Sequence, residues 1–266
     1  MDVLLYHHPG SLCSQKVRLA LAEKGVEYRA QVVDIGPRGE NFEPWYARIN
    51  PRMVVPTLVH DGVVVCDSAR IVRYIDGHFE GPALSASTEE GKRLEERWIA
   101  RADRLPLREI SYGTLRGPFG YVLRHSDRIR LRKLERMERA NPELAGLYRA
   151  RIEDVRQWFE RSRDPREVSA MLAELNEALD ELEAHSIGRM FIADERFGLA
   201  DILWTVVLAR VDGLGLGAHT DRRPRVREYI TRMMKRPSIE RAQVWNRVPW
   251  RVIGQTLLRS LLRKSS

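Results

Sequence analysis

The chain has 266 residues, a length that suits one large domain or two modest ones. Its hydrophobic fraction of 43% excludes an intrinsically disordered protein, and no run of about 18 or more apolar residues indicates a membrane span. The net charge of +8 comes from arginines spread along the chain, without a helix-turn-helix, zinc-finger or RNP pattern. We therefore interpret the charge as a solvated surface and expect no nucleic-acid partner.

The N-terminus and the cysteines indicate a compartment. Residues 1–6 lack the basic start and apolar run of a signal peptide. Two cysteines, Cys13 and Cys66, are too few for a disulfide framework and are typical of a reducing compartment. We therefore expect a cytoplasmic protein. No cluster of Cys and His residues predicts a metal site.

The first 80 residues alternate between strand and helix patterns. The expected strands cover residues 3–6, 28–33, 54–59 and 63–66, and helices are expected to start near Ser14, Pro44 and Ser68. Asp61-Gly62 is a strong hairpin signal between the last two strands. The order, βαβ followed by ββα, predicts a small α/β domain.

No further strand is predicted beyond residue 81, where the composition changes to helix-forming sequence. Helices are expected over residues 88–105, 127–140, 142–161, 165–185, 199–214 and from 224 to about 236. Pro106 and the stretch 112–118, with its glycines and proline, interrupt the pattern. We therefore expect an α/β domain at 1–80, an all-helical domain at 88–240 and a tail at 241–266.

The first group of residues that could carry chemistry is Ser11-Leu12-Cys13-Ser14, between the first strand and the first helix. The unpaired N–H groups and the dipole of a helix N-terminus favour negative charge. Cys13 could therefore be a nucleophile or form a mixed disulfide. Alternatively, Ser11 or Ser14 donates a hydrogen bond to a bound thiolate. On these residues alone, the simpler interpretation is favoured, in which a serine caps the helix and Cys13 packs as a small hydrophobe.

Two further pairs of residues could bind a ligand, one at the start of a strand and one at the start of a helix. Val55-Pro56 starts the third strand, and a cis peptide bond there would expose the backbone N–H and C=O of Val55 to a ligand. Asp67-Ser68 opens the helix after the fourth strand. Such a helix N-terminus can take a carboxylate, and Asp67 can take an ammonium group. The alternatives are an ordinary strand-start proline and an ordinary N-cap.

Together, in this order and spacing, these residues resemble the glutathione transferase superfamily. The motifs that carry the resemblance are Ser11-x-Cys13-Ser14, Val55-Pro56-x-Leu58, Asp67-Ser68, Ile71-x-x-Tyr74-Ile75 and Phe197-x-Leu199-Ala200-Asp201-Ile202. The resemblance implies a thioredoxin-like N-terminal domain, an all-helical second domain, glutathione as cosubstrate and a homodimer. It also implies activation of the glutathione thiol for attack on a hydrophobic or acidic electrophile, in the manner of a detoxification enzyme.

A closer likeness is to the tetrachlorohydroquinone reductive dehalogenases, which are transferases near the zeta class. It is carried by Asp34-Ile35-Gly36, Asn41-Phe42-Glu43-Pro44-x-Tyr46, Asn141-Pro142-Glu143-Leu144 and Ile202-x-Trp204-Thr205-Val206. In that family a cysteine at the position of Cys13 takes glutathione into a mixed disulfide during reductive dehalogenation, and some zeta enzymes are isomerases. We expect the second substrate beside Tyr112, Arg116 and Trp204 if their helices face the site. The alternative is that Tyr112 and Trp204 are core residues.

The resemblance also implies roles for single residues. Val55, before a cis-Pro56, would pair with the cysteinyl part of glutathione, and Asp67 with Ser68 would hold the γ-glutamyl end. Arg38 and Arg52 are candidates for the glycyl carboxylate by charge and location. The sequence departs from the family at Asp67, which is usually glutamate, at Leu12, usually a second serine, and at Gly198, usually a serine or threonine cap.

The tail favours a rival hypothesis. Residues 241–266 hold six basic residues and no acidic one, with apolar residues at helical spacing. This pattern is typical of a basic amphipathic helix at a membrane surface, which would suit a binding protein of the glutathione fold without turnover. The alternative, which we favour, is a terminal helix that packs on the helical domain.

Overall fold

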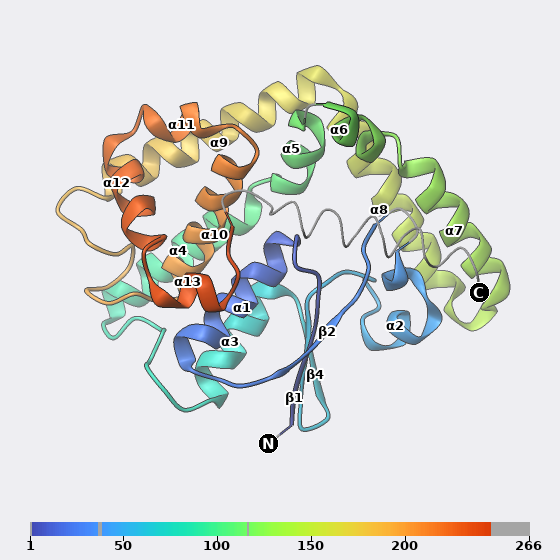
Figure 1. Ribbon diagram of the computed structural model, residues 1–266, viewed down its shortest axis with the longest axis horizontal. Helices are drawn as coiled ribbons and strands as arrows, with labels where there is room; N and C mark the ends of the chain where they lie inside the picture. Colours follow the sequence, from blue (N-terminus) through green and yellow to red (C-terminus); the bar gives the residue numbers. More distant parts are fainter. Residues whose placement is uncertain (1, 37–38, 116, 246–266) are drawn as a thin grey trace.

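The computed structural model describes residues 2–36, 39–115 and 117–245 (Figure 1). A mixed four-stranded sheet has the strand order β2-β1-β3-β4. The strands are β1 (Val3–His7), β2 (Arg29–Val32), β3 (Thr57–His60) and β4 (Val63–Cys66). β1 runs parallel to β2 and antiparallel to β3. Asp61 and Gly62 both have positive φ, as the predicted hairpin turn requires.

Three helices accompany the sheet. Figure 1 shows α1 (Leu12–Lys24) and α3 (Ser68–His78) on one side of it and α2 (Pro44–Ile49) on the other. α1 ends as predicted at Gly25, whose φ of 71° lets its N–H reach the last carbonyls of the helix. The expected thioredoxin-like order of strands and helices is therefore confirmed.

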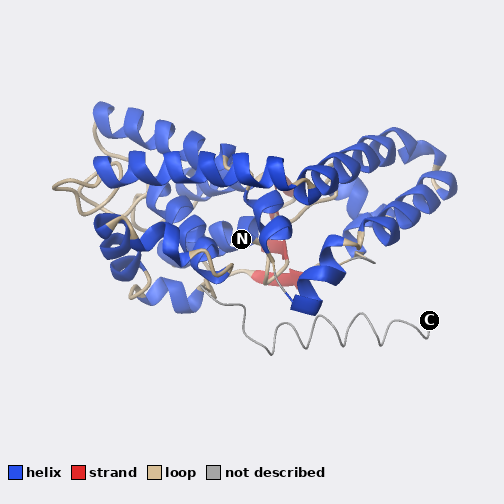
Figure 2. Ribbon diagram, turned by 90° about the horizontal axis from the view of Figure 1, so that it is seen from above, coloured by secondary structure: helices blue, strands red, loops and turns tan. Residues whose placement is uncertain are grey.

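All further elements are helical, as Figure 2 shows. The α-helices are α4 (Glu89–Arg104), α5 (Leu107–Thr114), α6 (Gly117–Arg124), α7 (Asp127–Ala140), α8 (Ala145–Arg163), α9 (Pro165–His185), α10 (Leu199–Gly213), α11 (Gly217–Asp221), α12 (Pro224–Met233) and α13 (Pro237–Arg241). Two 3-10 turns, η1 (Glu40–Phe42) and η2 (Pro142–Leu144), precede α2 and α8. The division of the chain between residues 80 and 88 stays a prediction.

One hydrophobic core joins the sheet to the helical part. It includes Leu5 of β1, Leu21 of α1 and Val207 of α10, all fully buried. α10 is buried almost all round and packs against both α1 and α4. Ion pairs fix α1 further, from Lys16 to Asp103 at 2.9 Å and from Glu23 to Arg236 at 2.8 Å. The helix α1 is thus held to α4 in its first half and to the segment after α12 at its C-terminal end.

A second hydrophobic cluster lies where the α7–α8 hairpin meets the segment around η1. Phe42 and Met53 are fully buried there beside Tyr148 of α8. The Tyr148 hydroxyl donates to the Phe42 carbonyl at 3.1 Å, and Lys133 Nζ lies 2.6 Å from Glu43 Oε1. The long middle region therefore covers the segment that links β2 to β3.

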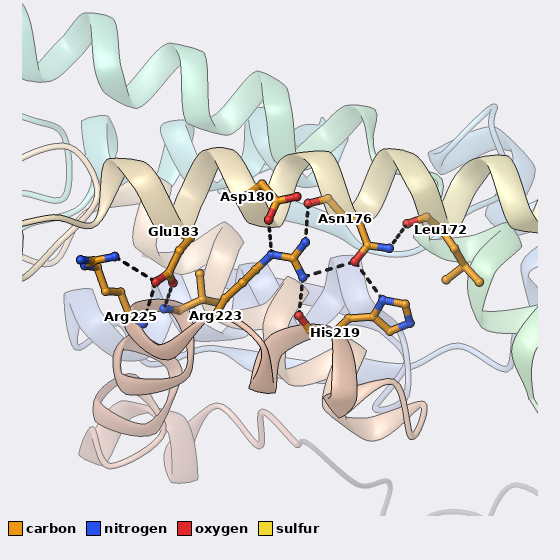
Figure 3. Close-up of polar contacts among 8 residues, drawn as sticks. Leu172, Asn176, Asp180, Glu183, His219, Arg223 and Arg225 are labelled. Atoms are coloured by element: carbon orange, nitrogen blue, oxygen red, sulfur yellow. Dashed lines mark hydrogen bonds and ion pairs between the residues drawn. The ribbon is translucent and has the colours of Figure 1, made fainter.

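Polar contacts hold α9 to the helices that follow α10 (Figure 3). The Arg223 guanidinium donates to Asp180 Oδ1 at 2.8 Å and to the Asn176 carbonyl at 3.0 Å. Asn176 Oδ1 lies 3.0 Å from His219 Nδ1, and Glu183 accepts from the backbone N–H of Val226. These bonds satisfy the first backbone N–H groups of α12 and explain why this end of the helical part is well packed.

The structure differs from the sequence-based expectations in several places. β3 starts at Thr57 and not at Val54, because Val54 and Val55 belong to an irregular segment before Pro56. The stretch 112–118, expected to interrupt the helices, contains the end of α5 and the start of α6, two helices that were not predicted. The short helices α11 and α13 were also missed, and β2 is mostly exposed because it lies at the edge of the sheet.

Candidate active site

Ser11, Cys13 and Ser14 lie at the start of α1 in three different settings. Ser11 is the N-cap, and its hydroxyl accepts from the Ser14 N–H at 3.2 Å. Ser14 is fully buried, and its hydroxyl accepts from the His8 N–H at 3.3 Å. Cys13 lies in the first turn, is half-buried and is not in a disulfide. The structure therefore brings Ser11 and Cys13 to the helix N-terminus and turns Ser14 inward.

Arg210 of α10 is the residue near Cys13 that sequence reasoning missed. Its Nη2 donates to the Gly10 carbonyl at 2.7 Å, one residue before the N-cap. Burial lowers the pKa of Arg210, and its electrostatic interactions with Cys13 and Tyr112 oppose this shift. The sequence signal was an arginine after a long apolar run in its helix, 200 residues away from Gly10 in the chain.

The peptide bond between Val55 and Pro56 is cis, as the resemblance implies. Two side-chain hydrogen bonds hold the segment before Pro56. The Val54 carbonyl accepts from Tyr46 Oη at 2.7 Å and from Asn50 Nδ2 at 2.8 Å. Burial raises the pKa of Tyr46, so its phenol stays neutral. Within the described part of the chain, neither the N–H nor the C=O of Val55 has a hydrogen-bond partner. Both groups can pair with a peptide-like ligand.

Asp67 is the N-cap of α3, with Ser68 as the first helical residue. Oδ1 accepts from the N–H groups of Ala69 and Arg70 at 3.0 and 3.2 Å. Oδ2 lies 3.7 Å from Nη1 of Arg52, and both side chains are largely exposed. The carboxylate thus fills the helix N-terminus with one oxygen and can take an ammonium group with the other.

The remaining predicted site residues fall in different places. Trp204 is fully buried, donates from Nε1 to the Trp98 carbonyl at 3.0 Å and belongs to the core, so its expected place beside the second substrate is wrong. Tyr112 is half-buried and packs edge-on against Trp158. Arg38 and Arg116, and the tail from residue 246, lie outside the described residues.

Gly198 and Asp201 show how one departure from the family motif is accommodated. A Cβ atom at Gly198 would lie 2.6 Å from the Leu84 carbonyl oxygen, so the close passage of that segment requires glycine. Asp201 still accepts from the Gly198 N–H at 3.0 Å, which is the expected half of the capping pair. Burial raises the pKa of Asp201 to about 6, against hydrogen bonds that favour its ionised form.

Arg18 connects the loop before α1 to the segment after α13. Its guanidinium donates to the carbonyls of Ala242 at 2.7 Å, of Gln243 at 3.1 Å and of Pro9 at 3.3 Å. It also lies 3.1 Å from His7 Nδ1. Burial, helped by the Arg18 charge, lowers the pKa of His7 to about 3. The first residues of the predicted tail are therefore held against the β1–α1 loop.

Comparisons with known proteins agree with this geometry. The N-terminal domain of glutathione S-transferases matches residues 10–78, and the C-terminal domain matches residues 142–237. Tetrachloro-p-hydroquinone reductive dehalogenase of Sphingobium chlorophenolicum is 37% identical over 244 residues, 91% of this chain and 96% of the relative. Glutathione S-transferase TCHQD of Arabidopsis thaliana is 27% identical over 270 residues, 98% and 99% of the two chains.

A solved structure shows the same fold. The beta-etherase LigF from Sphingobium sp. strain SYK-6 has a TM-score of 0.70 and 23% identity, with 91% of this chain and 98% of that chain covered. The chain belongs to the glutathione S-transferase family, and its resemblance to the tetrachlorohydroquinone dehalogenase type is confirmed. It is accordingly an enzyme of the glutathione transferase class, with glutathione as cosubstrate.

No group of three or more His, Cys, Asp or Glu side chains in residues 2–36, 39–115 and 117–245 is arranged to hold a metal ion. None of the helices in the same ranges is long and apolar enough to cross a membrane.

Proposed function

We propose that this enzyme is a reductive glutathione transferase in which Cys13 accepts glutathione from an intermediate. The observation that supports the proposal is the setting of Cys13, half-buried and without a disulfide in the first turn of α1, just after the Gly10 carbonyl that Arg210 binds at 2.7 Å. The dehalogenase activity of the relative with 37% identity points in the same direction. The thiolate is the form of a cysteine that attacks a sulfur atom, and the first turn of a helix is a common place for reactive cysteines.

The residues around α1 and α3 fit glutathione. The free backbone groups of Val55 would pair with its cysteinyl part, before Pro56. Asp67 Oδ2 would take the γ-glutamyl ammonium group, and Ser68 at the start of α3 would lie beside the γ-glutamyl carboxylate. Arg52, exposed beside Asp67, is close enough to this end of the ligand to contact a carboxylate. The glutathione sulfur would then lie at the N-terminus of α1, facing Ser11 and Cys13.

The reaction has three balanced steps. The glutathione thiolate attacks a carbon that bears a halogen, the carbon–sulfur bond forms and the halide leaves with its electron pair. The Cys13 thiolate then attacks the glutathione sulfur, so that a disulfide forms, and the carbon takes the electron pair and a proton from solvent. A second glutathione thiolate cleaves this disulfide, which restores Cys13 and releases oxidised glutathione. The substrate gains two electrons, which two glutathione molecules supply.

A serine-type transferase is the second candidate, and the position of Ser11 favours it. Its hydroxyl lies at the helix N-terminus and can donate its proton to a bound thiolate while its oxygen accepts from the Ser14 N–H. Ser14, buried and bonded to the His8 N–H, is left out of both mechanisms. An isomerase would use the same bound thiolate without the Cys13 step.

Mass spectrometry after exposure to oxidised glutathione separates these mechanisms. We expect selective glutathionylation of Cys13 in the wild type, its loss in Cys13→Ser, and a slower reaction at Cys66. Burial raises the pKa of Cys66, whose sulfur lies beside Thr57, so Cys66 is a matched internal control. Absence of an adduct at Cys13 would contradict the reductive mechanism and leave the serine-type transferase.

The coarser properties of the protein are proposed with the same mechanism. We place it in the cytoplasm, as a homodimer that detoxifies hydrophobic or acidic electrophiles. The rival, a non-catalytic glutathione-fold protein attached to a membrane surface by residues 241–266, predicts that the chain floats with anionic lipid vesicles. Sedimentation analysis tests the dimer, and flotation of the intact chain beside a chain ending at residue 245 tests the membrane hypothesis. Equal failure to float contradicts it.

A further inference from the structure

The outer side of α7 carries four arginines that have no acidic partner. They recur every three or four residues and therefore lie on one face of the helix. We call this set the arginine face: Arg128, Arg132, Arg136 and Arg139. All four are exposed, and none forms an ion pair within residues 2–36, 39–115 and 117–245. With a rise of about 1.5 Å per residue, they extend over about 16 Å of the helix.

The acids of α7 contact the neighbouring helix α8. Three ion pairs at 2.5 to 3.5 Å join the two helices: Asp127 with Arg163, Glu135 with Arg156 and Glu138 with Arg149. Glu135 is spaced to pair with Arg139 one turn further along α7, but it contacts α8 instead. These three are all the acids of α7, so the arginine face has no partner on its own helix.

The inner side of α7 is fixed to the rest of the protein. Leu134 is fully buried there. Arg130 Nη2 donates to the Ile35 carbonyl at 3.0 Å, and Lys133 Nζ donates to the Gly39 carbonyl at 2.9 Å. Figure 1 shows α7 at one end of the molecule and α11 and α12 at the other. The arginine face is therefore held outward, at an edge that can approach a flat surface.

Two exposed apolar side chains accompany these charges. Ile129, directly after Arg128, is 46% exposed, and Tyr121 of α6, the helix before α7, is 60% exposed. Arginine and tyrosine suit the headgroup layer of a membrane, and an aliphatic side chain suits the acyl boundary below it. The phosphate backbone of a nucleic acid offers no such apolar layer. The combination therefore favours a lipid surface over other polyanions.

We propose that the arginine face, together with Ile129, binds the surface of an anionic lipid bilayer. The guanidiniums would pair with lipid phosphate and carboxylate groups, which their planar N–H donors match. Ile129 would enter the boundary between headgroups and acyl chains. This inference goes beyond the proposed function, because it requires neither the chemistry of Cys13 nor residues 241–266.

Sedimentation with lipid vesicles tests the surface in the full chain. We expect the wild type to bind vesicles of phosphatidylcholine with phosphatidylserine and to stay in solution with pure phosphatidylcholine. Each basic residue near an anionic membrane strengthens binding about fivefold, so Arg132→Gln with Arg136→Gln should weaken it about 25-fold. Arg189→Gln with Arg222→Gln removes the same charge from exposed positions after α9 and α11. This matched control should change the affinity less than about twofold, since distant exposed charges are screened.

Ile129→Ser tests the apolar contribution. It should weaken vesicle binding about fivefold, because less apolar area leaves water. A DNA duplex and polyglutamate are measured in parallel as other polyanions. Tighter binding of either one, with the same dependence on Arg132 and Arg136, contradicts the lipid surface and assigns the arginine face to that polyanion.

Three further results overturn the proposal. The first is failure of the wild type to bind the anionic vesicles. The second is an equal loss in both arginine pairs, which would mean that only the net charge matters. The third is normal binding by the α7 pair and a loss in Arg259→Gln with Arg263→Gln, which would assign the attachment to residues 241–266. Urea unfolding of each variant checks that it is folded, and glutathionylation of Cys13 tests the proposed function separately.

Discussion

The connections β1–α1 and β4–α3 are built alike and carry opposite charge. Each leads from a strand of the same sheet into a helix with a side-chain N-cap, and each has a half-buried free cysteine nearby, Cys13 or Cys66. The cap of α1 is a neutral serine, and the Arg210 guanidinium lies beyond it. The cap of α3 is Asp67, whose carboxylate accepts from two backbone N–H groups.

The difference shows how charge assigns two similar helix N-termini to different tasks. The positive end of α3 is already compensated by an acid of the chain, so the free oxygen of Asp67 suits an ammonium group. The positive end of α1 is not compensated by any described carboxylate and is strengthened by Arg210, so it suits a thiolate. The proposed binding mode follows the same electrostatic rule, with the ammonium group of glutathione at α3 and its sulfur at α1.

The largest expected effect is on stability and comes from His7. This buried histidine belongs to the β1–α1 connection and has no counterpart in the β4–α3 connection. Burial and Arg18 lower its pKa to about 3, whereas the unfolded chain protonates it near its ordinary 6.5. As the pH falls, the unfolded state therefore binds a proton at a higher pH than the folded state. The contribution of His7 to the free energy of unfolding is complete above pH 6.5 and is lost as the pH falls from there toward 3. Urea unfolding should show a loss of about 2 kcal/mol between pH 6.5 and pH 5.

A variant without the imidazole checks the origin of this slope. His7→Leu should be less stable than the wild type at pH 8, because Arg18 loses an acceptor, and should have a flatter profile below pH 6.5. Parallel profiles for the two proteins would show that other groups cause the acid sensitivity.

The next effect concerns the charge at α3. Asp67→Asn keeps an oxygen that can accept from the N–H groups of Ala69 and Arg70 but removes the partner for an ammonium group. We expect glutathione affinity to fall about 10-fold in calorimetry, since hydrogen bonds to charged groups contribute roughly twice as much as neutral ones. Asp61→Asn, at the exposed hairpin turn, is the control and should bind normally. Unchanged affinity in Asp67→Asn would remove this residue from the site.

The smallest expected effect comes from replacing Ser11, the neutral N-cap of α1. Ser11→Ala should cost about 1 kcal/mol of stability in urea unfolding, as is usual for a lost N-cap. Ser11→Asp restores the cap and gives α1 the same acid as α3, so it should recover the stability while slowing glutathionylation of Cys13. If Ser11→Asp reacts as fast as the wild type, the contrast in charge between the two connections has no chemical role.

Local patterns predicted the elements next to the site. The hairpin at Asp61-Gly62, the stop at Gly25 and the start of α3 at Ser68 follow from short-range rules for turns, caps and glycine. α5 and α6 were missed because glycine and proline end helices in isolation, whereas packing against α8 and the neighbouring helices stabilises two short segments here. The burial of Ser14 and Trp204 likewise depends on helices far away in sequence.

The sequence by itself determined the order of strands and helices, the family and the short motifs at Ser11, Cys13, Val55 and Asp67, because each depends on neighbours within a few residues. Only the tertiary structure decided which charges surround them. Arg210 of α10 donates to the Gly10 carbonyl before α1, and this contact depends on how α10 packs against α1. Electrostatic energy depends on distance in space, and separation along the chain gives no measure of that distance.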